Sequence, residues 1–548
     1  MSELSPQQDA EKVSSRVPAK ADMAEEANRA VEAEHNMGLW QGLRTYPHVV
    51  GWSVLFSSAL IMEGYDNTLI ANLFAYEPFA KTFGDMQPDG TYQLTAAWQS
   101  GLTNGALVGE ILGLLVNGIV ADRFGYRRSI MGSLIACVAF IFIIFFARNL
   151  PVLLVGEILI GIPWGLFQTI TTTYASEVCP IVLRPYLTTY VNLCWVMGQV
   201  IASGVLKAMQ SRHDEWGYKI PFALQWIWPV PILIGVAFAP ESPWWLVRKG
   251  RIEEARHALK RLTKAEHDSD FNPDETIAMI QSTNELEKSM SEGTSYLDCF
   301  TGTDLRRTEV VCTTWAVQEM SGNALMGYGT YFYEQAGLAT SNAFTMSMVQ
   351  YILGAIGTIF SWILMSKCGR RTLFICGLIV MMTLLFIVGC LGIISRGNSV
   401  AQWAVGSLLL AFTFTYDATV GPTTYSLVSE MSSTRLRAKS IVLARILYNI
   451  CGICVNIITP RMLNPSSWDW GAKSGFFWAG MALLCLLWSY FRLPEPKGRT
   501  YAELDLLFEH GVSARKFSST HVDPFAVHGG NVVERTAEEP SVETMERI

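Results

Sequence analysis

Residues 118–128 read Gly-Ile-Val-Ala-Asp-Arg-Phe-Gly-Tyr-Arg-Arg, at the end of a long apolar stretch of the chain. A shortened copy of this ending, Gly369-Arg370-Arg371, follows another apolar stretch, and the glycines Gly125 and Gly369 are 244 residues apart (369 − 125). Arginines gathered directly after an apolar stretch are typical of the cytoplasmic ends of membrane helices. The recurrence predicts a duplicated unit.

Two further motif pairs recur in the same order. Ser176-Glu177 returns as Ser429-Glu430 at an offset of 253 (430 − 177), and Pro240-Glu241 returns as Pro494-Glu495 at an offset of 254 (495 − 241). Three motif pairs in one order and at nearly one spacing are hard to obtain by chance. We therefore interpret the chain as two copies of one unit, which is a common design of membrane transporters.

The composition indicates a membrane protein. Half of the 548 residues are hydrophobic and 16% are charged, whereas soluble domains have about 25% charged residues. Apolar runs long enough to cross a bilayer as helices recur along the chain, and alternation typical of strands is absent. The predicted fold class is an all-α membrane protein with twelve transmembrane helices in two pseudo-symmetric six-helix bundles. The predicted spans are 49–70, 96–120, 129–148, 152–173, 189–208, 221–239, 309–333, 345–366, 372–395, 402–428, 439–460 and 472–492.

These limits predict five regions. A largely disordered N-terminal tail (1–48) precedes an N-terminal six-helix bundle (49–239), a central loop with short helices (240–308), a C-terminal six-helix bundle (309–492) and a C-terminal tail (493–548). Lys and Arg gather in the loops on the side of the central loop, so the positive-inside rule places that loop and both tails in the cytoplasm. We predict a multi-pass monomer of the plasma membrane.

Other classes of function find little support in the sequence. The eleven cysteines show neither metal-ligand spacing nor a disulfide framework, so no metal site is predicted. The formal charge is −7 and no basic patch appears, which argues against a nucleic-acid partner. No catalytic or phosphate-binding motif rises above background, so we predict no enzyme activity and no cofactor.

The motifs together resemble the sugar porter family of the major facilitator superfamily. Residues 118–128 resemble the loop motif after the family's second helix. Residues 240–246, Pro-Glu-Ser-Pro-Trp-Trp-Leu, resemble its PESPRWL motif, with Trp244 where the family has Arg. Residues 494–500, Pro-Glu-Pro-Lys-Gly-Arg-Thr, resemble its PETKG terminus, with Pro for Thr. The resemblance covers residues 49 to 510 and implies alternating access between two bundles.

Within that family the chain resembles the fungal α-glucoside (maltose-type) permeases. The residues that carry this narrower resemblance are 63–66 (Glu-Gly-Tyr-Asp), 161–165 (Gly-Ile-Pro-Trp-Gly), Gly322-Asn323 with Gly327-Tyr328, and 468–477. The resemblance implies a sugar and a proton as the transported partners.

Charged residues at the predicted cytoplasmic helix ends suggest a gate. Glu177 and Glu430 each precede an arginine by seven residues, and Asp122 lies opposite a cluster of arginines. Such charges can pair in one conformation and separate in the other, which biases a two-state equilibrium. The alternative is that they only fix topology. The predicted gate residues are Asp122, Arg123, Arg127, Arg128, Glu177, Arg184, Arg370, Arg371, Glu430 and Arg437.

Glycines in the second predicted span recur every four residues. Gly101, Gly105, Gly109 and Gly113 fall on one side of a helix. A row of small residues lets two helices approach closely in a membrane. We therefore predict a tight helix contact along this face.

Ionisable residues inside predicted membrane helices are costly and usually functional. In the sugar porters that the chain resembles, the aspartate at the position of Asp66 carries the proton and pairs with an arginine in the fourth helix. That position reads Glu157 here, so Arg445 in the eleventh span is a candidate substitute partner. The alternative for the carboxyl groups is a satisfied buried hydrogen bond. The predicted proton-coupling residues are Asp66, Glu63, Glu110, Glu157 and Arg445.

Sugar sites combine amide and hydroxyl groups with aromatic rings, because each sugar hydroxyl must keep a hydrogen bond when it leaves water. The seventh span supplies such groups, and Gly322, Gly327 and Gly329 suggest a broken helix there. Gln318 begins a segment that resembles the family's QQxxGxN motif. The alternative for the amides is bonding between helices. The predicted sugar-binding residues are Gln318, Asn323, Tyr328, Asn192, Tyr425 and Asn449.

The leading prediction is proton-coupled import of an α-glucoside such as maltose by alternating access. A transport-inactive sugar sensor is a second possibility, but residues 493–548 show no repeated interaction motif. A passive facilitative carrier is a third, and the carboxyl groups inside the predicted membrane helices argue against it.

Overall fold

The computed structural model describes residues 39–87, 90–180, 183–263, 272–291, 295–395, 398–432, 436–497, 499, 501–522 and 532–534. Most of the predicted disordered tail, residues 1–38, lies outside the described residues, as do 523–531 and 535–548. The side chains of Arg184 and Arg437 also lie outside them.

The first half of the chain folds into a group of long helices. They are α3 (Leu39–Thr45), α4 (Pro47–Ser57), α5 (Leu60–Leu73), α6 (Glu77–Phe83), α7 (Ala96–Phe124), α8 (Tyr126–Phe145), α9 (Leu150–Val178), α10 (Arg184–Met209), α11 (Trp216–Leu224), η1 (Gln225–Ile227) and α12 (Pro229–Phe238). Between α6 and α7, the short strands β1 (Asp85–Met86) and β2 (Tyr92–Gln93) pair antiparallel.

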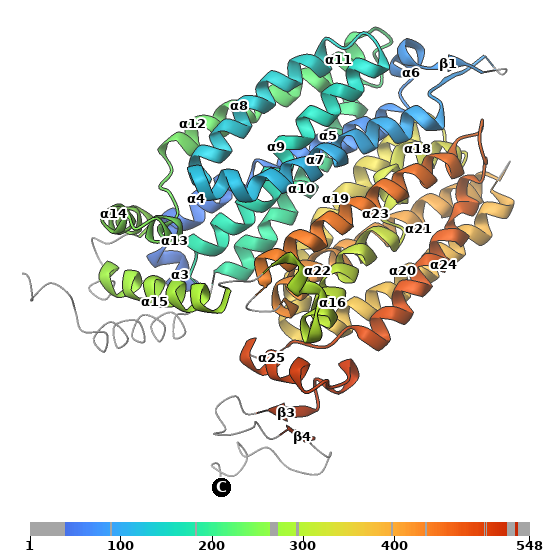
Figure 1. The fold of residues 1–548 in the computed structure, drawn as a ribbon. Helices are drawn as coiled ribbons and strands as arrows, with labels where there is room; N and C mark the ends of the chain where they lie inside the picture. The colour runs from blue at the N-terminus through green and yellow to red at the C-terminus, as the bar shows by residue number, and fades with distance from the viewer. Residues whose placement is uncertain are drawn as a thin grey trace, which may run out of the picture.

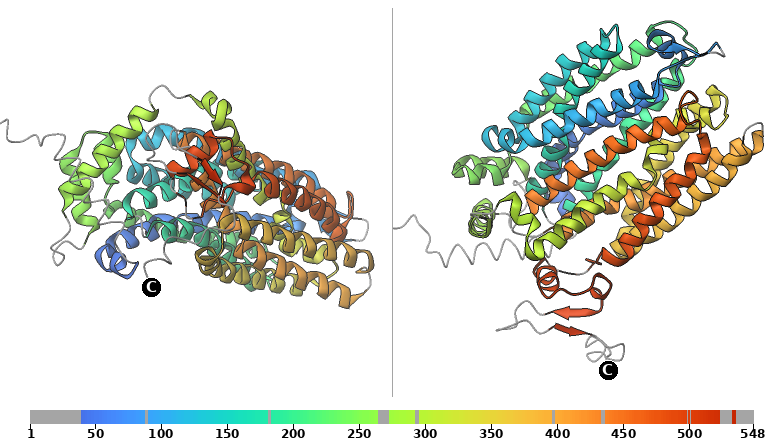
Figure 2. Two further views of the ribbon diagram at one scale, coloured as in Figure 1. Left: turned by 90° about the horizontal axis from the view of Figure 1, so that it is seen from below. Right: turned by 45° about the vertical axis from the view of Figure 1, so that its right-hand side comes forward.

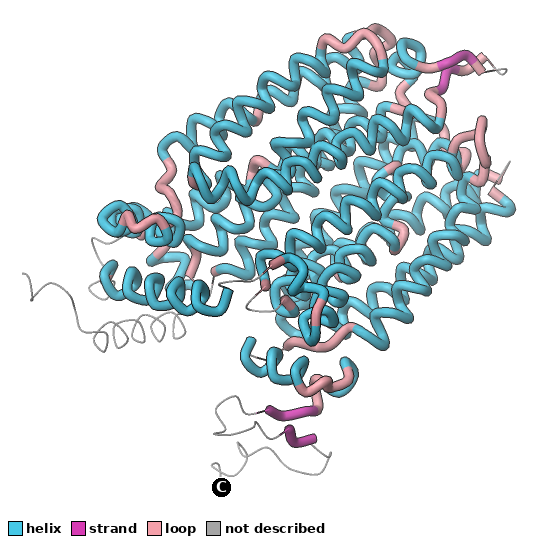
Figure 3. The backbone as a smooth tube through the Cα atoms, viewed as in Figure 1, coloured by secondary structure: helices cyan, strands magenta, loops and turns pink. Residues whose placement is uncertain are grey.

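Short helices lead to the second half. They are α13 (Pro243–Arg248), α14 (Ile252–Leu262), α15 (Pro273–Ser291) and η2 (Tyr296–Phe300). The second half contains α16 (Gly302–Met320), α17 (Asn323–Gly327), α18 (Gly329–Gln335), α19 (Thr340–Lys367), α20 (Arg370–Ile394), α21 (Ser399–Ala418), α22 (Val420–Met431), α23 (Arg437–Leu463), η3 (Gly471–Lys473) and α24 (Ser474–Arg492). The chain then forms α25 (Tyr501–Glu509), η4 (Ala514–Lys516) and the antiparallel strands β3 (Thr520–Val522) and β4 (Val532–Glu534). Helix dominates throughout (Figure 3).

The two halves form two bundles that lie side by side (Figures 1 and 2). Helix α10 of the first bundle packs on α19 of the second, and α7 packs on α23. The short helices α13–α15 and α25 lie at one end of the bundles, which we call the α14 end, while α6 and the β1–β2 hairpin lie at the other, the α6 end (Figure 1). The predicted fold class is confirmed.

Helix breaks interrupt several of the predicted spans, and among the described residues two of the spans contain no helix that is long and apolar enough to cross a membrane. In the described part of the chain, ten helices are long and apolar enough to cross a membrane by length and composition, and the predicted spans 49–70 and 309–333 are not among them. The first is divided into α4 and α5, where Ser58 Oγ donates to the carbonyl of Leu55 at 2.6 Å and the chain makes tight turns. The second is divided into α16, α17 and α18.

The break between α16 and α17 confirms the interpretation of the glycines in the seventh span. Gly322 has φ = 100°, in the left-handed region that only glycine adopts without strain. Helix α16 therefore ends at Met320, and α17 starts again at Asn323. The break leaves the residues around Gln318 and Asn323 at helix ends in the interior of the second bundle.

Close helix contact along α7 is confirmed for three of the four predicted glycines. A Cβ atom on Gly109 would lie 2.1 Å from the carbonyl oxygen of Ile158 in α9, and one on Gly161 would lie 2.2 Å from that of Ala106. Gly113 and Gly105 also face α9. The expectation for Gly101 is wrong, because a Cβ there would meet nothing within 4 Å.

Candidate functional site

A chain of polar side chains crosses from one bundle to the other near the middle of the long helices. Arg445 of α23 donates from Nε to Oε1 of Gln168 in α9 at 2.7 Å. The Nε2 of Gln168 donates to Glu63 of α5 at 2.6 Å and to Glu110 of α7 at 3.2 Å. Four residues from four helices thus form one network.

The walls of this network are aromatic on the side of the second bundle. The Arg445 guanidinium lies 4.3 Å from the ring centre of Tyr448 and 4.8 Å from that of Trp315. Trp315 meets Tyr425 edge-on at 4.9 Å. Cation–π contacts of this kind stabilise a buried guanidinium that has little access to water.

A second polar group lies inside the first bundle. Asp66 of α5 is fully buried, and its Oδ1 accepts a hydrogen bond from Nε2 of Gln225 in η1. The carboxyl group of Glu157 in α9 lies close enough to Asp66 for a hydrogen bond between the two groups. Two carboxyl groups can share such a bond only if one of them carries a proton.

Arg445 does not take the place of the missing fourth-helix arginine next to Asp66. In the described part of the chain, Arg445 donates a hydrogen bond to Gln168. Asp66 instead contacts Gln225 and Glu157. The reason is the packing of α23, which lies against α7 and α16 rather than against α5. The four predicted carboxyl groups therefore divide into two pairs, Glu63 with Glu110 and Asp66 with Glu157.

The predicted sugar-binding residues lie on both sides of this network. Gln318 of α16 donates to the carbonyl of Gly421 at 3.2 Å, while its Oε1 is buried and has no donor in the described part of the chain. The buried Oδ1 of Asn323 and Nδ2 of Asn192 are likewise unpaired among the described residues. Buried polar atoms are normally paired, so these atoms indicate a place for water or a polar ligand.

Among the remaining predicted sugar-binding residues, Tyr328 and Tyr425 have partners within the protein, whereas both polar side-chain atoms of Asn449 are buried and unpaired among the described residues. Tyr328 shares a hydrogen bond of 3.0 Å with Thr103 of α7, across the two bundles. Asn449 lies against Glu110, and Tyr425 lies against Arg445. The structure therefore brings Asn449 and Tyr425 into the network of Arg445, which the sequence did not indicate.

Gln168 was missed by the sequence analysis. It lies in an apolar predicted span, followed by the hydroxyl-rich residues Thr169, Thr171, Thr172 and Thr173. The only available signal was an amide side chain inside a membrane helix. Such amides often hydrogen-bond to neighbouring helices and need not bind a substrate.

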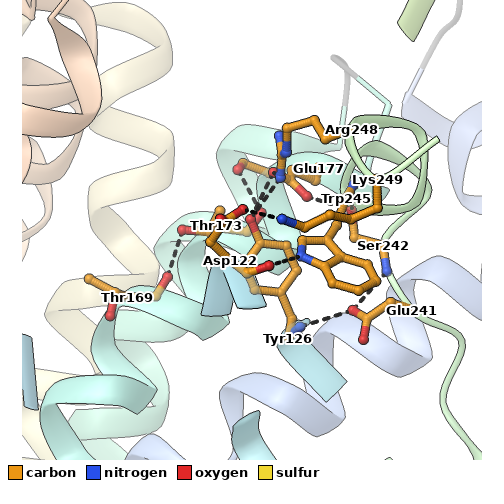
Figure 4. Close-up of polar contacts among 11 residues, drawn as sticks. Asp122, Tyr126, Thr169, Thr173, Glu177, Glu241, Ser242, Trp245, Arg248 and Lys249 are labelled. Carbon is orange, nitrogen blue, oxygen red and sulfur yellow. Dashed lines mark hydrogen bonds and ion pairs between the residues drawn. The ribbon is translucent and has the colours of Figure 1, made fainter. Parts of the chain in front are cut away.

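The gate motifs at the α14 end form a compact cluster around Glu177 (Figure 4). Glu177 accepts from Arg248 at 2.7 Å, from the Tyr126 hydroxyl at 3.0 Å and from Ser242. Burial alone would lower the pKa of Arg248, but Glu177 and Tyr126 outweigh burial and raise it. Glu177 thus ties α9 to α8 and α13 within the first bundle.

Several gate partners differ from those expected. Asp122 pairs with Lys249 at 3.1 Å rather than with the neighbouring arginines, and its carbonyl accepts from the Trp245 indole (Figure 4). The expected facing of Asp122 by arginines is therefore wrong, because α13 and the turn after it reach back to the end of α7. In the second bundle, Glu430 pairs with Arg370 at 3.4 Å.

The predicted gate arginines have different surroundings. Arg123 lies over Phe124, and Arg128 is exposed. Arg127 donates to the carbonyl of Ala237, and Arg371 donates to those of Leu493 and Tyr490. The predicted pairing of Glu177 and Glu430 with Arg184 and Arg437 falls on side chains outside the described residues.

The repeated Pro-Glu motifs cap two helices in equivalent ways. The Glu241 carboxylate accepts from the backbone N–H groups of Tyr126 at 3.1 Å and Arg127 at 3.2 Å, at the start of α8. Glu495 accepts from those of Arg370 at 2.9 Å and Arg371 at 3.1 Å, at the start of α20. Negative charge is favourable at a helix N-terminus. Burial nevertheless raises the pKa of Glu241 above its usual value.

Hydrogen bonds between the bundles gather towards the α6 end. Asn72 accepts from the backbone N–H of Thr330 at 3.0 Å, and Asn464 donates to the carbonyl of Leu94 at 3.1 Å. Lys207 donates to the carbonyl of Ser341 at 2.9 Å. These contacts hold the two bundles together at the end away from the gate motifs.

Comparison with known proteins agrees with this architecture. Residues 52–508 match the family described as "Sugar (and other) transporter". The chain is 45% identical over 521 residues to the general alpha-glucoside permease of Saccharomyces cerevisiae, covering 94% of this chain and 84% of the relative. It is 44% identical over 530 residues to maltose permease MAL61 of the same species, covering 96% and 86%.

Solved structures show the same fold at lower sequence identity. The proton:xylose symporter XylE bound to 6-bromo-6-deoxy-D-glucose matches with a TM-score of 0.68 and 21% identity, covering 84% of this chain and 99% of that one. A partially occluded inward-open form of XylE from E. coli matches with a TM-score of 0.67 and 20% identity, covering 83% and 100%. Both matches span the two bundles.

Proposed function

The chain belongs to the sugar transporter family, and on that premise we propose that it imports an α-glucoside such as maltose together with a proton. The protein is a multi-pass membrane transporter and not an enzyme. The names of the yeast relatives favour an α-glucoside as the cargo. The buried carboxyl groups favour coupling to a proton.

The observation that carries the proposed proton coupling is the pair formed by Asp66 and Glu157. Both side chains are at most 1% exposed, and they lie within hydrogen-bonding reach of each other. Two ionised carboxylates at this distance would repel strongly in a medium of low dielectric constant. The pair therefore holds one proton while α5 and α9 stay together, and moving them apart frees it. A passive carrier binds no proton during transport, so it does not require such a pair.

We further propose that the α14 end faces the cytoplasm and that the protein works as a monomer in the plasma membrane. Cations gather at the α14 end, as the positive-inside rule requires of cytoplasmic loops. With this orientation, the hydrogen bonds at the α6 end close the outer side. The cations concerned are Arg123, Arg127, Arg128, Arg248, Lys249, Arg370 and Arg371.

The experiment that tests this function is uptake by a yeast strain that lacks its own sugar transporters. We expect radiolabelled maltose to accumulate above its external concentration, and sugar addition to make the unbuffered medium more alkaline. Trehalose, sucrose and glucose define the range of cargo. Uptake that only equilibrates, without alkalinisation, would establish a passive carrier. No uptake of any of these sugars in cells that carry the protein at their surface would favour a sensor.

Gln318 gives a direct test of the sugar site. Its buried Oε1 has no donor in the described part of the chain, so a sugar hydroxyl can pair with it. We expect Gln318→Ala to raise the apparent KM for the sugar by about tenfold, the effect of losing a buried neutral hydrogen bond. Binding to the purified protein measures the effect without the transport cycle.

Thr314→Val is a matched control for Gln318→Ala. Thr314 lies one turn earlier in α16, is equally buried, and donates only to the carbonyl of Val310 in its own helix. We expect sugar affinity close to that of the wild type. Unchanged affinity in Gln318→Ala would remove this residue from the site.

A further inference from the structure

Gln168 stands between charges of opposite sign that belong to different bundles. Its Nε2 faces Glu63 and Glu110 of the first bundle, and its Oε1 faces Arg445 of the second. Arg445 makes no ion pair in the described part of the chain. The contact between the carboxyl groups and the arginine therefore runs through a neutral amide rather than through a salt bridge.

The orientation of this amide is fixed by its neighbours. The Arg445 guanidinium can only donate, so it requires the amide oxygen, and an ionised carboxylate can only accept, so it requires the amide NH2 group. The amide dipole then points along the line from negative to positive charge, which is its most favourable arrangement. This arrangement is most favourable when Glu63 and Glu110 are both ionised.

A proton on either carboxyl group changes the pattern of donors and acceptors. The protonated group has an O–H that must donate, and Oε1 of Gln168 belongs to the same network as an acceptor. If the amide turns to accept this bond, its NH2 group faces the Arg445 guanidinium, and two donors then oppose each other. The hydrogen bond between α9 and α23 is lost. The proton adds to one carboxylate oxygen from the medium and later leaves the same oxygen, so no other bond is made or broken.

We propose that Gln168 is a positioning residue that joins the two bundles through Arg445 only while Glu63 and Glu110 are both ionised, and so prevents the proton-free carrier from changing its conformation. This inference rests on the proposed symport, and it requires a proton on Glu63 or Glu110 in addition to the one held by Asp66 and Glu157. Protonation in the first bundle then changes the orientation of the Gln168 amide, and with it the contact to Arg445 of the second bundle. Proton binding then has to precede the movement.

Other titratable and charged groups face this network and contribute to the electrostatic interactions within it. They are Glu319 of α16, Tyr425 of α22 and Tyr448 of α23, while the indole of Trp195 in α10 donates to Glu63. Each of these also contacts a carboxyl group or the arginine. Gln168 is the side chain in the described part of the chain that hydrogen-bonds to carboxyl groups of one bundle and to the arginine of the other.

The test uses Gln168→Met, which keeps the length of the side chain and removes both halves of the amide. We expect sugar to move without the proton. The ratio of protons to sugar should fall below that of the wild type, and accumulation should fall by about tenfold, as for the loss of a hydrogen bond to a charged group. Downhill uptake should persist at alkaline pH, where wild-type uptake declines.

Gln350→Met is the matched control. Like the half-buried Gln168, the fully buried Gln350 of α19 has both halves of its amide paired. Its Oε1 accepts from Tyr333 at 2.7 Å, and its Nε2 donates to the carbonyl of Met326 at 3.0 Å. Both partners belong to its own bundle. We expect Gln350→Met to lower expression or rate but to keep the wild-type ratio of protons to sugar. A wild-type ratio and pH profile in Gln168→Met would overturn the proposal.

Gln168→Glu decides the question if Gln168→Met fails to reach the membrane. This variant keeps an acceptor for Arg445, replaces the NH2 group with an oxygen, and so brings a third carboxyl group into the network. We expect slow transport at neutral pH and recovery at acidic pH, when the added carboxyl group is protonated. Slow transport at every pH would contradict the proposal. If the wild-type protein itself moves no protons, the proposed symport fails, independently of any Gln168 variant.

Discussion

Asp66→Asn is expected to abolish accumulation of sugar against a gradient while sugar exchange across the membrane continues. Asparagine has nearly the shape of aspartate and can keep hydrogen bonds to Gln225 and Glu157, but it cannot bind or release a proton at neutral pH. The internal concentration of sugar should therefore not rise above the external concentration. Vesicles preloaded with sugar should still swap internal for external sugar, because exchange requires only a loaded carrier that moves between its two faces.

The comparison that makes this test decisive uses the other three carboxyl groups. Sugar-induced alkalinisation is measured for Asp66→Asn, Glu63→Gln, Glu110→Gln and Glu157→Gln at matched surface expression. Glu157→Gln should impair coupling less than Asp66→Asn, because its amide can still donate to an ionised Asp66 and leaves that group able to titrate. If Asp66→Asn drives sugar uphill with normal proton uptake, the carrier is whichever residue abolishes coupling and spares exchange.

The second large effect is expected at the contact between α7 and α9. Gly109→Ala and Gly161→Ala would place a methyl group 2.1 and 2.2 Å, respectively, from a backbone oxygen of the other helix, far inside van der Waals contact. Backbone cannot rotate away as a flexible side chain does, so the helices must separate. We expect a loss of stability of about 3 kcal/mol, at the upper end for overpacking, and little protein at the cell surface.

Gly101→Ala is the control on the same helix. A Cβ atom at this position meets nothing within 4 Å, and alanine favours helix more than glycine does. We expect surface expression and thermal stability in detergent to equal or exceed those of the wild type. Normal expression of both Gly109→Ala and Gly161→Ala would mean that α7 and α9 do not approach each other this closely.

The large-scale architecture could be predicted because it depends on features that the sequence displays directly. Apolar runs have the length of a bilayer, and motifs repeat at one spacing between the halves. The break at Gly322 was also visible, since glycine clusters mark helix ends. The break near Ser58 was not, because a serine followed by an alanine fits the interior of a helix equally well.

Pairings within the site could not be predicted in the same way. Glu63, Asp66, Glu110, Glu157 and Arg445 each stand out as charges in apolar spans, but their grouping depends on how four helices are rotated about their axes. Gln168 carries no charge and therefore gave no signal of its own. Lys249 was not among the predicted gate residues, because its contact with Asp122 depends on the path of the chain after α12.

The carboxylate caps at Glu241 and Glu495 have a consequence for the history of the molecule. Each cap connects the end of the last helix of a bundle to the start of the third helix of that bundle. Both copies therefore kept this cap after the duplication. The ends of the two halves have stayed alike, whereas the centres differ, since Gln168, Glu63 and Glu110 lie on one side of the network and Arg445 on the other. Because the caps stabilise the helix ends, residues at the centre can be substituted and the transported substrate can change while the fold stays the same.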